Sequence, residues 1–255
     1  MSINEPGPDP ISAIAPALTG PVLMNQDWRD LTFLHWAVPP ERVTHLMPPG
    51  VRPDTVEGNT YVGLVPFRMV NAAPMRGRGT PWLGTFLETN VRLYSVDATG
   101  RRGVVFLSLD CNRLVVVAGA RLAFAVPYRW ATMRHTRREV PSGTEHTYAA
   151  RLLNRGSRVM SNVTVRVGSE RSATALDEFL SARWGLHTQW PKIRGVGRTL
   201  YIPNSHEPWP LRDAELVHFE DQLMASVGLP ELAARPPDHI AFSPGVHTEF
   251  GFPRR

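Results

Sequence analysis

Charged side chains interrupt one of the most apolar parts of this chain of 255 residues. Glu88, Arg92 and Arg121 lie between Phe86 and Tyr128, where most neighbouring residues are apolar. Burying a carboxylate or a guanidinium inside a sheet is costly unless the charge is paired or contacts a ligand. In a cavity that excludes water, such a set can hold a carboxylate and supply an acid or base with a shifted pKa.

Strand geometry brings two of these residues together. Residues four apart on a strand point to the same face, so a strand through this stretch places Glu88 and Arg92 on one face. The structural alternative is a buried ion pair that joins neighbouring strands and contacts no ligand. The sequence favours neither interpretation. His35 lies in an apolar run, where a histidine is more often a hydrogen-bonded core residue than a ligand contact, and we retain it as a candidate ligand-binding residue.

Other kinds of catalytic centre have no support in the sequence. None of the nine histidines shows the H-x-x-x-H or H-E-x-x-H spacing of a metal site, and Cys111 is the only cysteine. No Gly-x-Ser-x-Gly motif occurs, and Gly195 and Gly197 lack the third glycine of a dinucleotide site. We therefore predict no metal and no cofactor, and Cys111 as a buried structural thiol.

Composition indicates a globular protein. With 42% apolar and 9% aromatic residues, the chain can bury a sizeable core. The single cysteine excludes an internal disulfide and fits a reducing compartment. No secretory signal opens the chain, and the longest apolar run, near residues 114–120, is too short to cross a bilayer. We predict a cytoplasmic protein with no membrane contact, and leave a homo-oligomer open.

The basic charge has two explanations. The formal net charge is +5, and Lys192 is the only lysine, so arginine supplies 27 of the 28 basic residues. The densest cluster contains Arg129, Arg134, Arg137 and Arg138 and could attract anions. Because no nucleic-acid-binding motif accompanies it, the cluster favours a solvated face over a nucleic-acid surface.

Hydrophobic patterns predict a mostly β protein. Residues 1–22 are proline-rich and without periodicity, so we expect a disordered arm before a single domain at 23–255. The proline- and glycine-rich segment 74–81 is expected to be a loop over a cavity mouth. Alternating segments predict strands at 59–70, 86–97, 103–110 and 113–125, a hairpin of 146–153 with 161–167, and a strand pair within 239–252. Other patterns predict helices at 40–47, 128–133, 172–184 and 211–227. Many strands and few peripheral helices favour a closed or nearly closed barrel.

Short motifs then follow the order found in one enzyme family. Glu88, Ser108-Leu109-Asp110, Gly119-Ala120-Arg121 and Val126-Pro127 resemble the series of motifs in acetoacetate decarboxylases. Over roughly residues 25–250 the chain resembles the YqjF-like family more closely, which is grouped with the acetoacetate decarboxylase-like fold. The motifs of that closer resemblance are Phe33-Leu34-His35-Trp36, Leu46-Met47-Pro48-Pro49-Gly50, Pro66-Phe67, Pro127-Tyr128 and His206-Glu207-Pro208-Trp209-Pro210-Leu211. The resemblance implies a barrel of this type with an internal cavity.

One departure limits what the resemblance implies. In the decarboxylases a lysine follows the proline of the last motif and forms a Schiff base with the substrate ketone. Tyr128 stands at that position here, and Leu122 stands where the family has an acidic residue after its arginine. A phenol cannot form an imine, so lysine-dependent decarboxylation is not expected.

The sequence leads to one main functional prediction and two alternatives. We predict that the chain binds, with or without transforming, a small organic acid or carbonyl compound; a lyase- or hydratase-like activity stays open. By resemblance, Glu88 is the acid or base, Arg121 the anion clamp and Tyr128 a hydrogen-bond donor that faces the cavity, with Glu88 or a ligand oxygen as its partner. The alternatives are a non-catalytic ligand-binding or sensing protein and, less favoured, a nucleic-acid-binding module. The predicted ligand contacts are Arg92, Phe67, Trp82 and His35, with Phe67 and Trp82 as apolar walls.

Overall fold

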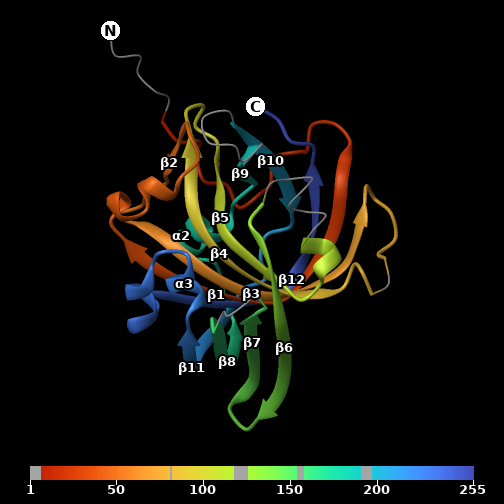
Figure 1. Cartoon of the computed structure of the whole chain (residues 1–255), viewed down its shortest axis with the longest axis vertical. Helices are drawn as coiled ribbons and strands as arrows, with labels where there is room; N and C mark the ends of the chain where they lie inside the picture. The colour runs from red at the N-terminus through yellow and green to blue at the C-terminus, as the bar shows by residue number, and fades with distance from the viewer. Residues whose placement is uncertain (1–6, 81, 118–125, 154–157, 191–196) are drawn as a thin grey trace.

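The computed structural model describes residues 7–80, 82–117, 126–153, 158–190 and 197–255, and strands dominate them (Figure 1). The strands are β1 Val22–Val38, β2 Val51–Pro53, β3 Thr60–Pro74, β4 Phe86–Asp97, β5 Arg102–Cys111, β6 Tyr128–Val140, β7 Gly143–Leu152, β8 Met160–Glu170, β9 Gly185–Trp190, β10 Arg198–His206, β11 Arg212–Asp221 and β12 His239–Gly251. The short helices are η1 Pro40–Arg42, η2 Thr44–Leu46, α2 Ala175–Ser181, α3 Leu223–Ser226 and η3 Pro230–Ala234. The mostly β class is confirmed.

The strand pairings close on themselves in two rings. Both rings share the wall formed by β12, β1, β3, β4 and β5. Strands β9 and β10 complete the small ring, and β6, β7, β8 and β11 complete the large ring. Closure pairs strand edges that an open sheet would expose. The expected barrel-like closure is therefore present in ring-like form, although two rings with a common wall are not one simple barrel.

The shared wall is buried on both faces. On β4 the even-numbered residues face the small ring, whereas Val91 and Leu93 pack in a core with residues of β1, β3, β7 and β8. Ten of the twelve residues of β4 are buried, and the other two, Leu87 and Arg92, are partly buried. This double burial explains why the sequence of β4 reads as an almost continuous apolar run in which the polar residues stand out.

Several expected elements are confirmed. The strand expected at 86–97 coincides with β4, that expected at 59–70 overlaps β3 from Thr60 onward, and that expected at 103–110 lies within β5. The expected hairpin is present as antiparallel β7 and β8, although its turn lies outside the described residues. The helix expected at 172–184 is shorter, because Thr174 and Asp177 form a capping box that starts α2 at Ala175.

Four expectations were wrong. Residues 128–133 begin strand β6 instead of forming a helix. Of the strand expected at 113–125, residues 114–117 are helical, and residues 118–125 lie outside the described part of the chain. Most of the helix expected at 211–227 is strand β11, with α3 after it, because pairing with β8 outweighs the helix propensity of its Ala, Glu and Leu residues. The strand pair expected within 239–252 is the single strand β12, paired with β1 along most of its length.

Residues 7–21 contain no helix or strand but contact the sheet. Arg102 Nε donates a hydrogen bond to the carbonyl of Asp9 at 2.6 Å, and Trp184 Nε1 donates to the carbonyl of Ser12 at 2.9 Å. Within the part of the chain that the structure describes, no helix has the length and apolar character needed to cross a membrane.

A glycine on β12 lies where this strand closely approaches β1. Gly245 has φ 123°, and a Cβ there would lie 1.9 Å from the carbonyl oxygen of Trp28 on β1. Gly50 also has a positive φ, 75°, but open space around its Cβ position. We expect Gly245→Ala to lower the free energy of unfolding by about 2 kcal/mol more than Gly50→Ala, measured by urea denaturation. Equal losses would show that β12 can move away from β1 at little cost.

Candidate functional site

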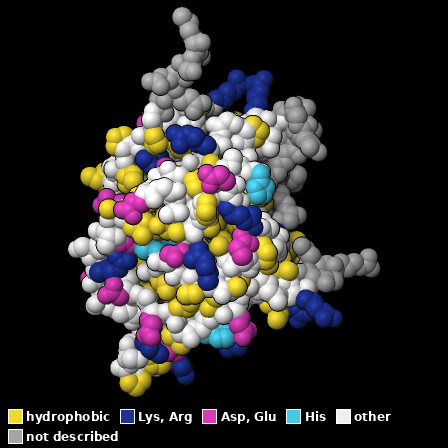
Figure 2. Space-filling view, turned by 90° about the vertical axis from the view of Figure 1, so that its left-hand side faces the viewer, with side chains coloured by type: hydrophobic (Ala, Val, Ile, Leu, Met, Phe, Trp, Pro, Cys, Tyr) yellow, Lys and Arg dark blue, Asp and Glu magenta, His cyan; other side chains and the backbone are white. Residues whose placement is uncertain are grey.

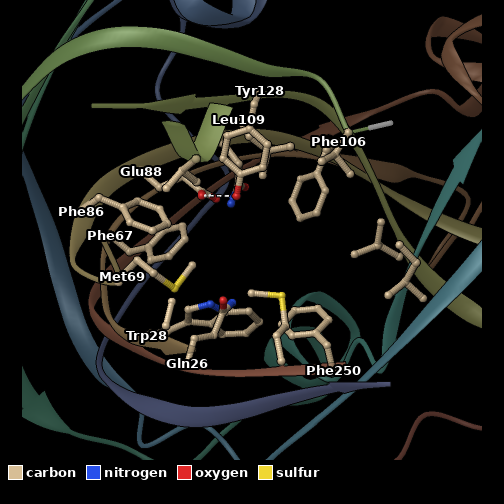
Figure 3. Close-up of a pocket in the computed structure, with 18 of the residues that line it drawn as sticks. Gln26, Trp28, Phe67, Met69, Phe86, Glu88, Phe106, Leu109, Tyr128 and Phe250 are labelled. Atoms are coloured by element: carbon tan, nitrogen blue, oxygen red, sulfur yellow. Dashed lines mark hydrogen bonds between the residues drawn. The ribbon is translucent and has the colours of Figure 1, made fainter. Parts of the chain in front are cut away.

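The small ring encloses a cavity of about 470 Å³ (Figure 3). This volume lies within the range of small-molecule sites. Strands β1, β3 and β4 supply most of the lining, with contributions from β5, β6, β9, β10 and β12. Most of the wall is apolar, and its aromatic residues include Trp28, Phe67, Phe86, Phe106 and Phe250.

Three polar side chains of the lining come from alternate positions of β4. Glu88, Asn90 and Arg92 all line the cavity, because alternation directs every second residue of the strand to the same face. The expectation that Glu88 and Arg92 share a face is therefore confirmed. No ion pair of Glu88 is present among the described residues. The structural alternative, a Glu88–Arg121 pair, involves a residue outside that part of the chain and stays open.

Glu88 is hydrogen-bonded to Tyr128. The phenol of Tyr128 donates to Glu88 Oε2 at 2.7 Å, and the side chain of Glu88 is only 3% exposed (Figure 3). Burial raises the pKa of Glu88 from 4.5 to about 7, against the opposing effect of hydrogen bonds from Tyr128 and Asn90. Burial and the neighbouring Glu88 raise the pKa of Tyr128 well above 10, so this phenol stays a donor. Near neutral pH, Glu88 can therefore either accept or release a proton.

The position of Tyr128 depends on an ion pair beside it. Tyr128 opens β6 in parallel register with Leu109 of β5. The next residue, Arg129, donates to both carboxylate oxygens of the buried Asp110, with 2.8 Å between Nη2 and Oδ2. A bidentate contact of this kind fixes the start of β6 against β5. The sequence alone does not predict this role for Asp110 or Arg129.

Arg92 has no ion pair within the described part of the chain. Its Nε donates to the hydroxyl of Tyr94 at 3.1 Å, and its Nη2 lies 3.4 Å from the carbonyl of Leu180. Its guanidinium lies 5.5 Å from the ring centroids of both Phe33 and Tyr94. A guanidinium that lines an apolar cavity without a carboxylate partner is suited to bind an anionic ligand.

Two further polar atoms in the cavity wall lack partners among the described residues. They are Nε1 of Trp28 and Oδ1 of Asn90. Leaving a buried polar atom without a hydrogen bond costs about 1–3 kcal/mol, so both atoms are candidates for ligand contacts. Asn90 was missed although the alternation from Glu88 to Arg92 signals it. Trp28 carries no comparable local signal, because its stacking against Trp209, at 5.7 Å between centroids, joins distant segments.

Of the two residues expected as apolar walls, one lines the cavity and the other does not. Phe67 lines the cavity, as expected for a wall residue. Trp82 does not: it has φ 63°, is 65% exposed and stacks under the guanidinium of Arg113. Its ring lies in solvent, while Thr80 and Leu83 of the same loop reach the lining.

His35 does not line the cavity either. Its ring is 1% exposed and makes hydrogen bonds to Tyr94 and His239. It lies one side chain behind the wall, because Tyr94 stands between it and Arg92. Arg121, the expected anion clamp, and Lys192 lie outside the described residues, so the role assigned to Arg121 stays a prediction.

Cys111 has the environment of a structural thiol. It pairs with Glu88 across β4 and β5 and is fully buried. Burial, with a smaller effect from the charge of Glu88, raises the pKa of the thiol to about 12, so it stays protonated and unreactive near neutral pH.

The described histidines and the face drawn in Figure 2 show no second kind of site. Among the described residues, no three His, Cys, Asp or Glu side chains gather as a metal-binding group. On the face drawn in Figure 2, basic and acidic side chains are interspersed. Within the arginine cluster of β6, Arg137 pairs with Glu139 and Arg138 with Glu145. These pairs reduce the net positive charge of that strand.

Known proteins resemble this chain in sequence and in fold. The family DUF2071, described as an uncharacterized conserved protein, matches residues 25–247. The uncharacterized protein YqjF of Bacillus subtilis (strain 168) is 28% identical over 195 residues, which are 76% of each chain. The enduracididine biosynthesis enzyme MppR complexed with pyruvate has a TM-score of 0.63 at 15% identity, over 93% of this chain and 91% of that one. An acetoacetate decarboxylase-like enzyme from Sphingomonas wittichii RW1 has a TM-score of 0.62 at 13% identity, over 94% of each chain. These structures share the acetoacetate decarboxylase-like fold with this chain.

The buried carboxyl group predicts a pH-dependent stability. Because the pKa of Glu88 is higher in the folded chain than in the unfolded chain, its protonated form favours folding, and that stabilisation is lost as pH rises from about 4.5 through 7. Glu88→Gln has no such loss. We expect the stability of this variant relative to the parent to rise by about 2 kcal/mol between pH 5 and pH 8. Urea denaturation across this range measures the difference, with Glu41→Gln on the surface as control, and a constant difference would contradict the raised pKa.

Proposed function

This chain belongs to the DUF2071 family, and we propose that it binds a small organic acid or carbonyl compound in the cavity of the small ring. One observation carries the proposal: an apolar cavity holds the protonatable Glu88 with Tyr128 and, separately, the guanidinium of Arg92. The fold shared with acetoacetate decarboxylase-like enzymes supports a site inside the sheet. MppR, which has this fold, is described in complex with pyruvate.

The cavity suits a ligand with one charged end and an apolar body. A ligand carboxylate would accept hydrogen bonds from Arg92, the cation of the described wall that lacks an ion pair. Apolar atoms would pack against aromatic walls such as Phe67 and Phe86. A carbonyl or hydroxyl oxygen would satisfy Nε1 of Trp28, and a hydroxyl donor would satisfy Oδ1 of Asn90. These requirements describe an oxo or hydroxy acid.

Glu88 is the group proposed to move a proton. With its pKa near 7, a part of the population is ionised and can remove a proton from the carbon beside a ligand carbonyl. The protonated Glu88 then returns the proton to carbon, or to a departing hydroxyl in a dehydration. Tyr128 donates a hydrogen bond that stabilises the ionised carboxylate. This proton exchange is balanced within the ligand and Glu88 and fits a lyase- or hydratase-like reaction.

A binding or sensing protein without turnover is the alternative for the same cavity. The two functions differ in whether bound ligand exchanges protons. Incubating phenylpyruvate in deuterated water and following its methylene signal by NMR separates them, because enolisation replaces hydrogen by deuterium. Faster exchange with the parent than with Glu88→Gln supports catalysis, and equal rates together with retained binding support the sensing role.

We also propose that the chemistry proceeds without a Schiff base. By the resemblance, Tyr128 occupies the place of the decarboxylase lysine, and Lys192 is the only lysine in the chain. Incubation with acetoacetate and borohydride, followed by intact mass measurement, is therefore expected to show no covalent adduct. A stoichiometric adduct mapped to Lys192 would refute this part of the proposal.

The cationic end of the cavity predicts selectivity for charged ligands. Arg92→Met keeps an unbranched apolar chain but removes the charge. We expect it to weaken binding of phenylpyruvate at least tenfold and to leave binding of its methyl ester unchanged, because a charge-assisted hydrogen bond contributes about 1.5–3 kcal/mol. Isothermal titration calorimetry measures both affinities, and Arg113→Met, whose guanidinium lies over Trp82, is the control. Equal weakening of acid and ester would argue against an anion clamp at Arg92.

A further inference from the structure

A chain of hydrogen bonds runs from the cavity wall to helix α2. Arg92 Nε donates to Tyr94 Oη at 3.1 Å, and Tyr94 Oη lies 2.6 Å from His35 Nε2. His35 Nδ1 lies 2.9 Å from His239 Nδ1, and His239 Nε2 lies 2.8 Å from Asp177 Oδ1. The five residues come from β4, β1, β12 and α2, so only the folded chain brings them together.

The chemistry of the two ends gives every bond one direction when each histidine carries a single hydrogen. Burial opposes ionisation of Asp177, but hydrogen bonds from Arg171, His239 and Thr174 outweigh it and hold its pKa well below the usual range. The ionised carboxylate can only accept, so His239 Nε2 carries the hydrogen and donates. Burial lowers the pKa of His35 well below 6.5, so His35 is neutral and has one N–H.

The remaining assignments follow from this direction. If His239 carries its hydrogen on Nε2, its Nδ1 accepts the hydrogen bond from Nδ1–H of His35. The Nε2 of His35 then accepts from the hydroxyl of Tyr94, whose oxygen is left to accept from Arg92. Each donor meets an acceptor, and all bonds point from Arg92 towards Asp177.

We propose that Tyr94, His35 and His239 are positioning residues that hold Arg92 in the cavity wall for a ligand carboxylate. This inference rests on the proposed function of the cavity. Hydrogen bonds in a series polarise one another, so the charge of Asp177 makes Tyr94 Oη a stronger acceptor for Arg92. The chain thus orients the guanidinium without placing a carboxylate on it, and the ligand supplies the counter-charge.

A glycine provides the space that this arrangement needs. Gly63 lies on β3 between His35 on β1 and Arg92 on β4, and it is the register partner of both. A Cβ on Gly63 would lie 3.1 Å from His35 Cδ2 and 3.2 Å from Arg92 Cγ. Both side chains therefore cross β3 where a side chain is absent, and this lets them meet at Tyr94.

The tautomers of His35 and His239 test the proposed series of hydrogen bonds without any ligand. We expect NMR of protein labelled with ¹⁵N-histidine to show neutral His35 with its hydrogen on Nδ1 and His239 with its hydrogen on Nε2 at neutral pH. The Nδ1–H form is the minor tautomer of free histidine, so a fold that merely buries the ring would not select it. A folded protein in which His35 carries its hydrogen on Nε2 would overturn the proposal.

Removing one hydroxyl tests the effect on Arg92. Tyr94→Phe keeps the ring under the guanidinium but removes the acceptor, so the Nε–H of Arg92 should exchange with solvent at least tenfold faster and phenylpyruvate should bind about tenfold more weakly. The methyl ester should bind as before. His187→Gln is the matched control, because His187 is equally buried but bonds to Ser95 and Asp97, away from this chain.

Further outcomes separate this inference from the function on which it rests. If the Nε–H of Arg92 exchanges with solvent as slowly in Tyr94→Phe as in the parent, the proposed role of the hydrogen-bond series is wrong, even if the ligand still binds. If the parent binds neither phenylpyruvate nor pyruvate, the proposed function fails, whereas the tautomers and the Arg92 exchange still decide whether the chain exists. If Tyr94→Phe does not fold, His239→Leu at the partly exposed end serves instead, and an unchanged His35 tautomer in that variant would refute the proposal.

Discussion

Strand β4 is buried along most of its length, with only Leu87 and Arg92 partly exposed, since it lies between the cavity of the small ring and the core shared with β7 and β8. A buried polar group on this strand therefore costs free energy unless it has a partner inside the protein. Glu88 accepts a hydrogen bond from Tyr128, and Arg92 donates one to Tyr94. The other strands of the small ring complete the wall of the cavity that Glu88 and Arg92 line.

The arrangement keeps an acid and a cation in one cavity without letting them neutralise each other. A direct pair of Glu88 with Arg92 would lower the pKa of the carboxyl group and occupy the guanidinium. Instead, the carboxyl group has a phenol as neighbour, and burial raises its pKa to about 7. The guanidinium has a phenol as well, so both groups keep their capacity for a ligand. Tyr128 and Tyr94 are thus the hydrogen-bond partners of Glu88 and Arg92 in place of a direct ion pair between the two charges.

Fold and chemistry separate clearly in this chain. Its sheet matches those of acetoacetate decarboxylase-like enzymes over more than nine tenths of its length at 13–15% identity. Such a match concerns the scaffold, which offers a cavity of suitable size. What such a cavity binds or converts depends on its side chains, and a phenol such as that of Tyr128 cannot form the imine that an amine forms. The aromatic wall sets the shape and polarity of what can enter.

The sequence by itself determined the parts whose signal is local. The apolar run of 86–97 predicted β4, alternation placed Glu88 and Arg92 on one face, and motif order pointed to Tyr128 beside Glu88. Tertiary structure decided what depends on distant partners. Residues 211–227 form a strand because β8 offers hydrogen bonds that a local helix would forgo. Trp82 is exposed in a loop where its backbone φ is positive, and His35 lies behind Arg92 because β1 pairs with β12. Neighbouring residues in the sequence encode neither feature.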